Sequence, residues 1–178
     1  GRHLSTRKWV KAHLIMGTKT QIVTGAKITT ELEGDCPQLP ELLATTKEHF
    51  DIEEVSADKA YSSRANLPAI EQAGAMPFIP FRSNTTGKQG GAPIWRKMWL
   101  YVQLHQEEFL AHYHKRSKAE TTMYMIKTKF GDAVRAKTWA AQVNEVLCKI
   151  LCHNLCVVIQ EMHELGIEAT LTDSNAAR

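Results

Sequence analysis

The sequence has no long apolar run and no obvious export signal. None of its segments reaches the roughly 18 consecutive apolar residues that a membrane-spanning helix needs. The first residues, GRHLSTRKWVKAHLIMG, lack the unbroken apolar core of a signal peptide. The chain also does not start with methionine. We therefore expect a cytoplasmic protein with no membrane partner, and a chain that is a piece of a longer one.

The sequence is also poor in cysteine, and its cysteines show no CxxC pair. Cys148, Cys152 and Cys156 recur at every fourth residue, which places them on one helical face, where disulfide pairing is sterically unfavourable. A metal site that combines them with His153 remains an alternative, although no CxxC pair supports it. The pattern favours reduced cysteines buried as small apolar side chains.

The composition predicts one globular domain with a basic half. The 178 residues are 43% hydrophobic, which is enough for a single sizeable core. The formal net charge is only +3, but residues 82–129 are markedly basic. The basic residues of that segment are Arg82, Lys88, Arg96, Lys97, Lys115, Arg116, Lys118, Lys127 and Lys129, and the acidic ones are Glu107, Glu108 and Glu120. Clustered positive charge suits a polyanionic partner.

The first third of the chain predicts a hairpin, a helix and a strand. The runs 9–16 and 21–29 are rich in β-forming residues and flank a short turn, which is typical of a hairpin. Helical spacing of apolar residues follows over 40–50. The segment 52–61 then indicates a buried strand that ends at Asp58.

The rest of the chain predicts three further helical regions and one strand. These are a helix over 66–73, a strand over 77–81, a loop over 82–93, and helices over 95–129 and 138–165. Asn66 is a candidate N-cap, and a helix break is expected near His112. The predicted apolar face of the last helix consists of Val143, Val146, Leu147, Ile150, Leu151, Leu155 and Val158. This order indicates an α/β domain over 1–165, a mixed sheet covered by helices, with a polar tail over 166–178.

Four reactive side chains share one stripe of a predicted helix. In YHKRSKAETTMYMIK, Tyr113, Arg116, Glu120 and Lys127 fall within roughly 60° of arc on a helix. The simplest explanation is a solvated face with an Arg–Glu pair, which is worth only a few tenths of a kcal/mol. The stripe becomes more informative when it is considered with Asp58.

Asp58 follows a predicted strand, where open α/β sheets often present functional groups. It could equally be a turn-forming residue of DKAYSS. An aspartate at a strand end and a glutamate on a facing helix can share a divalent cation, since Mg²⁺ favours carboxylate oxygens. Asp58 and Glu120 are therefore candidate ligands, although two carboxylates are few for a metal site.

The spacing Y-x(2)-R-x(3)-E-x(6)-K, filled by the four residues of the stripe, resembles the signature around the catalytic glutamate of the DDE transposases of bacterial insertion sequences. VSADKAYSS is similar to the second catalytic block of that family. RKWVKAHL and NEVLCKILCHNLCVVI resemble other parts of it, so that the resemblance runs from about residue 8 to residue 159.

The resemblance implies an RNase H-like fold, a mixed sheet flanked by helices. In that plan the first catalytic aspartate lies on the first strand, which is central in the sheet. This chain would begin at the second strand, so it would lack both the central strand and that aspartate. Asp35, in the loop EGDCPQ, is expected to lie too far from the strand ends to replace it.

By resemblance, three carboxylates hold two Mg²⁺ or Mn²⁺ ions that act on a DNA phosphate during cleavage and strand transfer. Asp58 and Glu120 would be catalytic metal ligands. The residues expected to contact DNA are Tyr113, Arg116 and Lys127 near the scissile bond, and Lys115, Lys118, Arg96 and Lys97 elsewhere on the backbone. The implied partners are the DNA ends of the element, target DNA, and further copies of the protein in a synaptic complex.

Two alternatives stay open at this point. One is a non-catalytic DNA-binding remnant of a transposase, which kept the basic face after the catalytic set was lost. The other is an unrelated metal-dependent nuclease or phosphatase whose spacing is coincidental. As it stands, the fragment is expected to be inactive alone.

Overall fold

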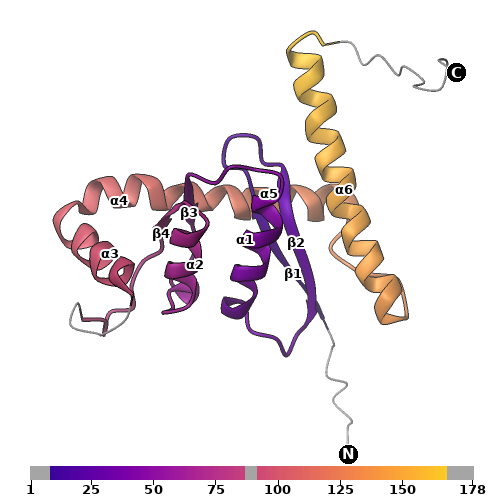
Figure 1. Cartoon of the computed structure of the whole chain (residues 1–178). Helices are drawn as coiled ribbons and strands as arrows, with labels where there is room; N and C mark the ends of the chain where they lie inside the picture. Colours follow the sequence, from indigo (N-terminus) through magenta and orange to yellow (C-terminus); the bar gives the residue numbers. More distant parts are fainter. Residues whose placement is uncertain (1–8, 87–91, 168–178) are drawn as a thin grey trace, which may run out of the picture.

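A computed structural model describes residues 9–86 and 92–167 (Figure 1). Its strands are β1 (Val10–Met16), β2 (Val23–Thr30), β3 (Glu54–Ser56) and β4 (Met76–Phe78). Its α-helices are α1 (Leu39–Lys47), α2 (Asn66–Gln72), α3 (Pro93–Leu104), α4 (Gln106–Tyr113), α5 (Ser117–Phe130) and α6 (Trp139–Glu164). Three 3₁₀ turns are η1 (Cys36–Gln38), η2 (Lys59–Tyr61) and η3 (His114–Arg116). The predicted α/β class is confirmed.

The predicted hairpin is present. β1 and β2 pair antiparallel from Val10 opposite Thr30 to Ile15 opposite Gly25, with a register shift at the end next to the turn. Two backbone bonds close that turn, from Gly17 N to Ile22 O and from Gln21 N to Gly17 O. The hairpin forms a sheet of its own.

The other two strands form a second, separate sheet. β3 and β4 pair in parallel, from Glu54 opposite Met76 to Ser56 opposite Phe78, and α2 makes the crossover between them. The described strands thus make two small sheets instead of one mixed sheet, because β1 and β3 are not hydrogen-bonded to each other.

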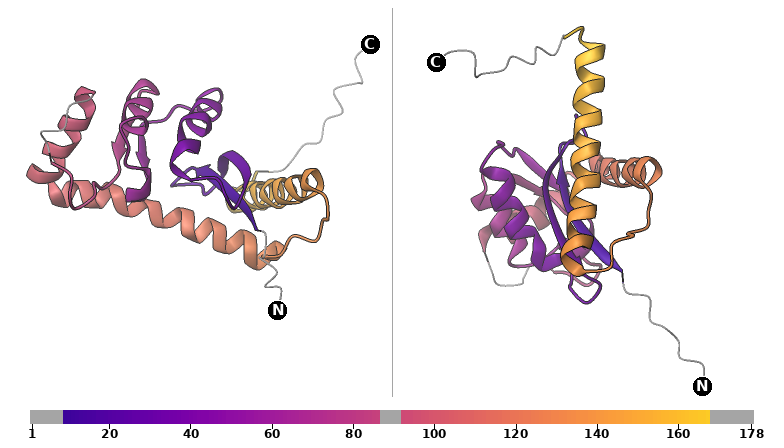
Figure 2. Two further views of the ribbon diagram at one scale, coloured as in Figure 1. Left: turned by 90° about the horizontal axis from the view of Figure 1, so that it is seen from below. Right: turned by 90° about the vertical axis from the view of Figure 1, so that its right-hand side faces the viewer.

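Helices hold the two sheets in one body. Leu43 of α1, Leu67 and Ile70 of α2 and Met98 of α3 are all at most 2% exposed and belong to the same core. The segment after α4 also contacts both sheets, since η3 contacts β3 and α5 contacts β1. α5 therefore runs past both sheets (Figure 2, left). This packing fixes the loop after β3 relative to the start of α5.

α6 packs against the hairpin and α5 by a narrow face. Ile150, His153 and Val157 are buried there. The Asn154 side chain donates from Nδ2 to Val23 O and accepts at Oδ1 from Val23 N, both at 2.8 Å. His153 Nε2 lies 3.0 Å from Gln21 O. These contacts hold the helix to the free edge of β2 while its far half projects beyond the body (Figure 2, right).

The predicted apolar face of α6 is correct only in part: Ile150 is buried, and Val146 packs in the same cluster. Of the residues expected to be buried, Leu147, Leu151, Leu155 and Val158 are 39 to 59% exposed. The prediction that the cysteines are buried is also wrong, because Cys148 and Cys152 are exposed, and Cys36 and Cys156 are half-buried free thiols. By length and composition alone, α6 is apolar enough to cross a membrane, with a mean hydropathy of 1.3 and 17% of that window buried. A helix of a soluble protein can meet the same criteria.

Two local predictions need correction. Asn66 is not an N-cap, because its side chain turns inward and donates to Cys36 O at 3.0 Å and Tyr61 O at 2.9 Å. The helical region after residue 93 breaks at His105, whose φ of −131° is not helical, as well as at η3 near the expected place. The predicted tail over 166–178 lies mostly outside the described residues, which end at residue 167.

Candidate functional site

Asp58 begins the loop that follows β3. Its backbone is extended, with φ −63° and ψ 154°, and its carbonyl accepts from Tyr61 N at 2.9 Å as η2 begins. Its side chain is 57% exposed. The strand therefore presents this carboxylate at its carboxyl end, as the sequence predicts.

Arg116 brings Asp58 and the helical stripe together. Its Nε lies 3.2 Å from Asp58 Oδ1 and donates to Tyr113 Oη at 2.9 Å, while a terminal nitrogen donates to Glu120 Oε1 at 2.6 Å. Its guanidinium carbon lies 5.3 Å from the centre of the Tyr113 ring. The hydrogen bond to Glu120 raises the pKa of Arg116, against some desolvation, and Tyr113 and Asp58 add to the rise. Two carboxylates thus share one cation.

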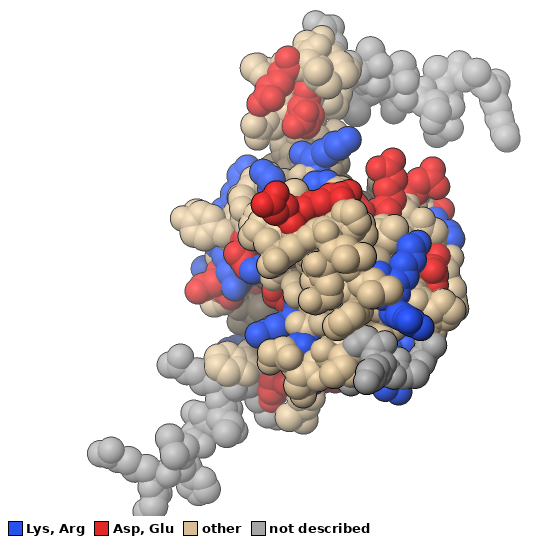
Figure 3. Space-filling model, turned by 90° about the vertical axis from the view of Figure 1, so that its left-hand side faces the viewer, with Lys and Arg blue, Asp and Glu red and all other residues tan. Residues whose placement is uncertain are grey.

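The remaining predicted DNA-contacting residues are spread over the molecule. Lys118 and Lys127 are exposed on α5, with Lys127 roughly 10 Å along the axis from Glu120. Arg96 and Lys97 are exposed on α3, at the far end of the molecule from α5 and α6 (Figure 1). In Figure 3, which faces that end, basic and acidic side chains are interspersed. The structure does not gather all of them into one surface.

Lys115 belongs to a different network. Its Nζ donates to Glu54 Oε1 at 2.6 Å, and Glu54 Oε2 pairs with His112 Nδ1. The His112 ring stacks on Phe78 with centroids 4.2 Å apart, and its carbonyl accepts from Ser56 Oγ at 3.0 Å. These contacts fasten the end of α4 to β3 and β4, and so they position Arg116 beside Asp58.

Burial tends to raise the pKa of Glu54, but hydrogen bonds from Lys115 and His112 outweigh it and lower that pKa below its ordinary value. Helical periodicity and the family resemblance do not indicate this network. The available signal was an acidic residue inside a short strand, four residues before Asp58, together with a histidine one helical turn before Arg116.

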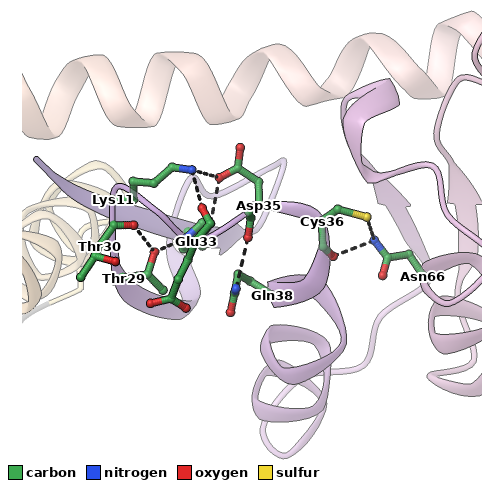
Figure 4. A network of polar contacts seen from close by, with 10 residues as sticks. Lys11, Thr29, Thr30, Glu33, Asp35, Cys36, Gln38 and Asn66 are labelled. Atoms are coloured by element: carbon green, nitrogen blue, oxygen red, sulfur yellow. Dashed lines mark hydrogen bonds and ion pairs between the residues drawn. The ribbon is translucent and has the colours of Figure 1, made fainter.

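Asp35, in the loop after β2, acts on the same tyrosine as Asp58. Burial raises the pKa of Tyr61, and the charges of Asp35 and Asp58 raise it further, so both carboxylates act on the same phenol. Asp35 is itself paired with Lys11 at 2.9 Å (Figure 4). It also lies 3.5 Å from His13, whose pKa is lowered by burial. Its carboxylate already has a cationic partner.

The described part of the chain offers two carboxylates to a metal ion, and no cluster of three or more His, Cys, Asp or Glu there could hold one. Asp58 and Glu120 are hard oxygen donors of the kind that Mg²⁺ and Mn²⁺ prefer. They are both exposed and lie against the same guanidinium. They therefore fit part of a divalent-metal site, and a further ligand is needed to complete it.

Comparison with known proteins adds one finding. A family model described as "Transposase DDE domain" matches residues 1–155, which include Asp58, the helical stripe and the first half of α6. No solved structure matches the chain.

Proposed function

The chain belongs to the transposase DDE domain family, and we propose that it is part of the catalytic domain of an insertion-sequence transposase that cleaves DNA and transfers its strands. The observation that carries the proposal is that Arg116 joins Asp58 and Glu120 in one site. The two carboxylates come from separate elements, as the two motifs of the family would require. The proposed domain extends over residues 1–165.

We further propose that the complete domain is RNase H-like and that its first, central strand is missing from this chain. The split into two sheets supports this, because β1 and β3 each have a strand partner on only one side in the described structure. An additional strand between them would pair with both and merge the sheets. It would also satisfy backbone groups that otherwise lack sheet partners, and it would carry the first catalytic aspartate.

In the complete site, Asp58 and Glu120 would hold two Mg²⁺ or Mn²⁺ ions together with that aspartate. Such ions stabilise charge on the attacking and leaving oxygens of phosphoryl transfer. Arg116 pairs with both carboxylates in this chain, and its planar guanidinium is suited to bind a phosphate when they engage metal. Tyr113 orients Arg116 by accepting its Nε hydrogen bond.

DNA is the proposed partner, both as element ends and as target. Lys127 and Lys118 are well placed for phosphate contacts, since they are exposed on the helix that carries Glu120. Lys115 would first have to leave Glu54. Arg96 and Lys97 would contact DNA at a more distant position. Self-association in a synaptic complex and a cytoplasmic, nucleoid-associated location are parts of the same proposal.

A non-catalytic DNA-binding remnant is the second candidate. The finding that favours it is that the described residues provide only two of the carboxylates that a DDE site needs. A metal-binding measurement separates the two candidates. Electron paramagnetic resonance of Mn²⁺ is expected to show two bound ions in a chain extended upstream through the first strand, with loss of binding in Asp58→Asn. Absence of Mn²⁺ binding in the extended chain would support the remnant.

A further inference from the structure

Helix α6 is apolar on two opposite sides. One side, with Ile150 and Val157, is buried against β2 and α5. The other side faces away from the domain, and Leu151 and Leu155 on it are 59% and 52% exposed. A solvated helix face normally carries polar residues. The outer side therefore needs a separate explanation.

The outer side follows a regular repeat. Its residues are spaced by three, four, three, four and three positions: Cys148, Leu151, Leu155, Val158, Met162 and Leu165. This is the spacing of the seam along which two helices pack as a coiled coil. We call these six residues the outer seam. Leu147, Cys152 and Ile159 widen it, and Ile159 is 65% exposed.

The outer seam contains no charged side chain. Lys149, the lysine of α6, is turned back to its own domain, where Nζ binds Gly131 O at 3.2 Å, Ala133 O at 2.7 Å and Glu145 Oε1 at 3.3 Å. The exposed apolar surface is on the order of 500 Å² per copy, which is as large as the largest patches that monomers usually show. Two such surfaces together reach about 1,000 Å², near the lower bound for a specific interface.

We propose that α6 pairs through the outer seam with α6 of a second copy of this chain. A repeat of this spacing is complementary to itself, which a two-fold interface requires. A partner recognised by charge is disfavoured because the outer seam has no charged side chain. α6 is already folded and held by Asn154 and His153, so pairing does not have to pay for helix formation.

The domain contacts of α6 also argue against a membrane as the occupant. Asn154 and His153 bind backbone groups of the hairpin on the inner side, and the charged Glu145 and Lys149 lie within the helix. The projecting end carries Glu161 and Glu164 and no lysine or arginine. Helices that lie on a membrane surface are typically rich in basic residues instead.

This pairing would provide the surface for the self-association proposed above, but it is argued only from the residues of α6. Its test therefore needs no DNA cleavage. Light scattering should give twice the mass of one copy for the 178-residue chain, whose single copy has a mass of 20.0 kDa. The upstream-extended chain should likewise give twice the mass of its own single copy. The double variant Leu155→Glu, Val158→Glu should return both to the mass of one copy. Both positions are exposed, so circular dichroism should show an unchanged fold. The control Gln160→Glu, His163→Glu adds the same charges to α6 outside the seam and should leave the dimer intact.

Cross-linking tests the seam directly. In a variant with Cys36, Cys152 and Cys156 replaced by serine, Cys148 should form an intermolecular disulfide on oxidation if the helices are parallel. Adding Leu165→Cys should allow cross-linking if they are antiparallel, since the two positions then lie opposite each other. The proposal is overturned if both chains are monomers at about 100 μM, if mass doubles only with lipid vesicles, or if the dimer survives the double seam variant. If the dimer of the double seam variant persists in the 178-residue chain but not in the extended chain, the open edges of β1 and β3 form the contact instead.

Discussion

Nε of Arg116 lies 3.2 Å from Oδ1 of Asp58, and this contact joins the loop after β3 to the start of α5. The same guanidinium binds Glu120, four residues further along the chain. Two carboxylates that are 62 positions apart in the sequence therefore meet at one cation. In the proposed catalytic domain, these carboxylates would bind metal ions, and Arg116 would become available to phosphate.

Arg116→Ala should change stability little and function strongly. Its ion pairs are partly exposed, so the free energy of unfolding should fall by about 0–1 kcal/mol. In the upstream-extended chain, we expect weaker cleavage and a salt dependence of DNA binding reduced by about one phosphate contact. Binding measured at several salt concentrations checks this. An unchanged slope would mean that Arg116 serves only its protein partners.

Glu120→Gln should abolish metal-dependent cleavage by the extended chain and leave DNA binding largely intact. The substitution keeps the size of the side chain and removes the charge that a metal ligand needs. Gel-shift and nicking assays on the same preparation measure the two properties. Glu107→Gln, at an exposed position on α4 outside the site, is the matched control and should cleave normally. Full cleavage by Glu120→Gln would refute the ligand assignment.

Glu54→Gln should destabilise the protein by about 1–2 kcal/mol near neutral pH, because Lys115 and His112 lose a charged acceptor. The pKa of Glu54 is lowered in the folded state, so its contribution is present above the ordinary pKa of 4.5 and is lost as pH falls through the folded pKa. The difference between wild type and variant should therefore shrink in acid.

Urea unfolding at neutral and acidic pH measures this contribution. The neighbouring Glu53→Gln is the control, since Glu53 is exposed and makes no ion pair within the described residues. An equal loss of stability in both variants, or a difference that persists at low pH, would contradict the role of the Glu54 network.

Asn154→Ala should destabilise the attachment of α6 by about 1–3 kcal/mol, because the N–H and C=O of Val23 would both lose their partner. Hydrogen exchange of the amides of β2 and α6 reports this local effect. Asn144→Ala, at an exposed position of the same helix, is expected to have little effect. Equal protection in the two variants would mean that the pair of bonds does not hold the helix.

Much of the fold follows from local patterns. The hairpin and the positions of α1, α2 and α6 were predictable, since β-forming runs and helical spacing act over short distances. The meeting of Asp58 with the helical stripe was predictable only through the family resemblance. Periodicity places Arg116 and Glu120 on one face, but it does not tell which strand end that face approaches.

The errors came from tertiary packing. Periodicity shows that α6 is apolar, but on a helix with two apolar sides it cannot show which side meets the domain. The buried side is chosen by Asn154, which binds Val23 of β2, and by His153, which contacts Gln21 O in the turn of the hairpin. The exposure of Cys148 and Cys152 follows from the same choice. The break at His105 has no proline or glycine beside it to signal it.

The most direct test of the account is a Mn²⁺-dependent nicking and strand-transfer assay on DNA that carries the element ends. It compares the 178-residue chain with a form extended upstream through the proposed first strand. We predict that only the extended form nicks DNA and joins strands, and that Asp58→Asn and Glu120→Gln both abolish its activity. Cleavage by the short chain alone, or by the extended chain carrying either substitution, would contradict the proposed catalytic set.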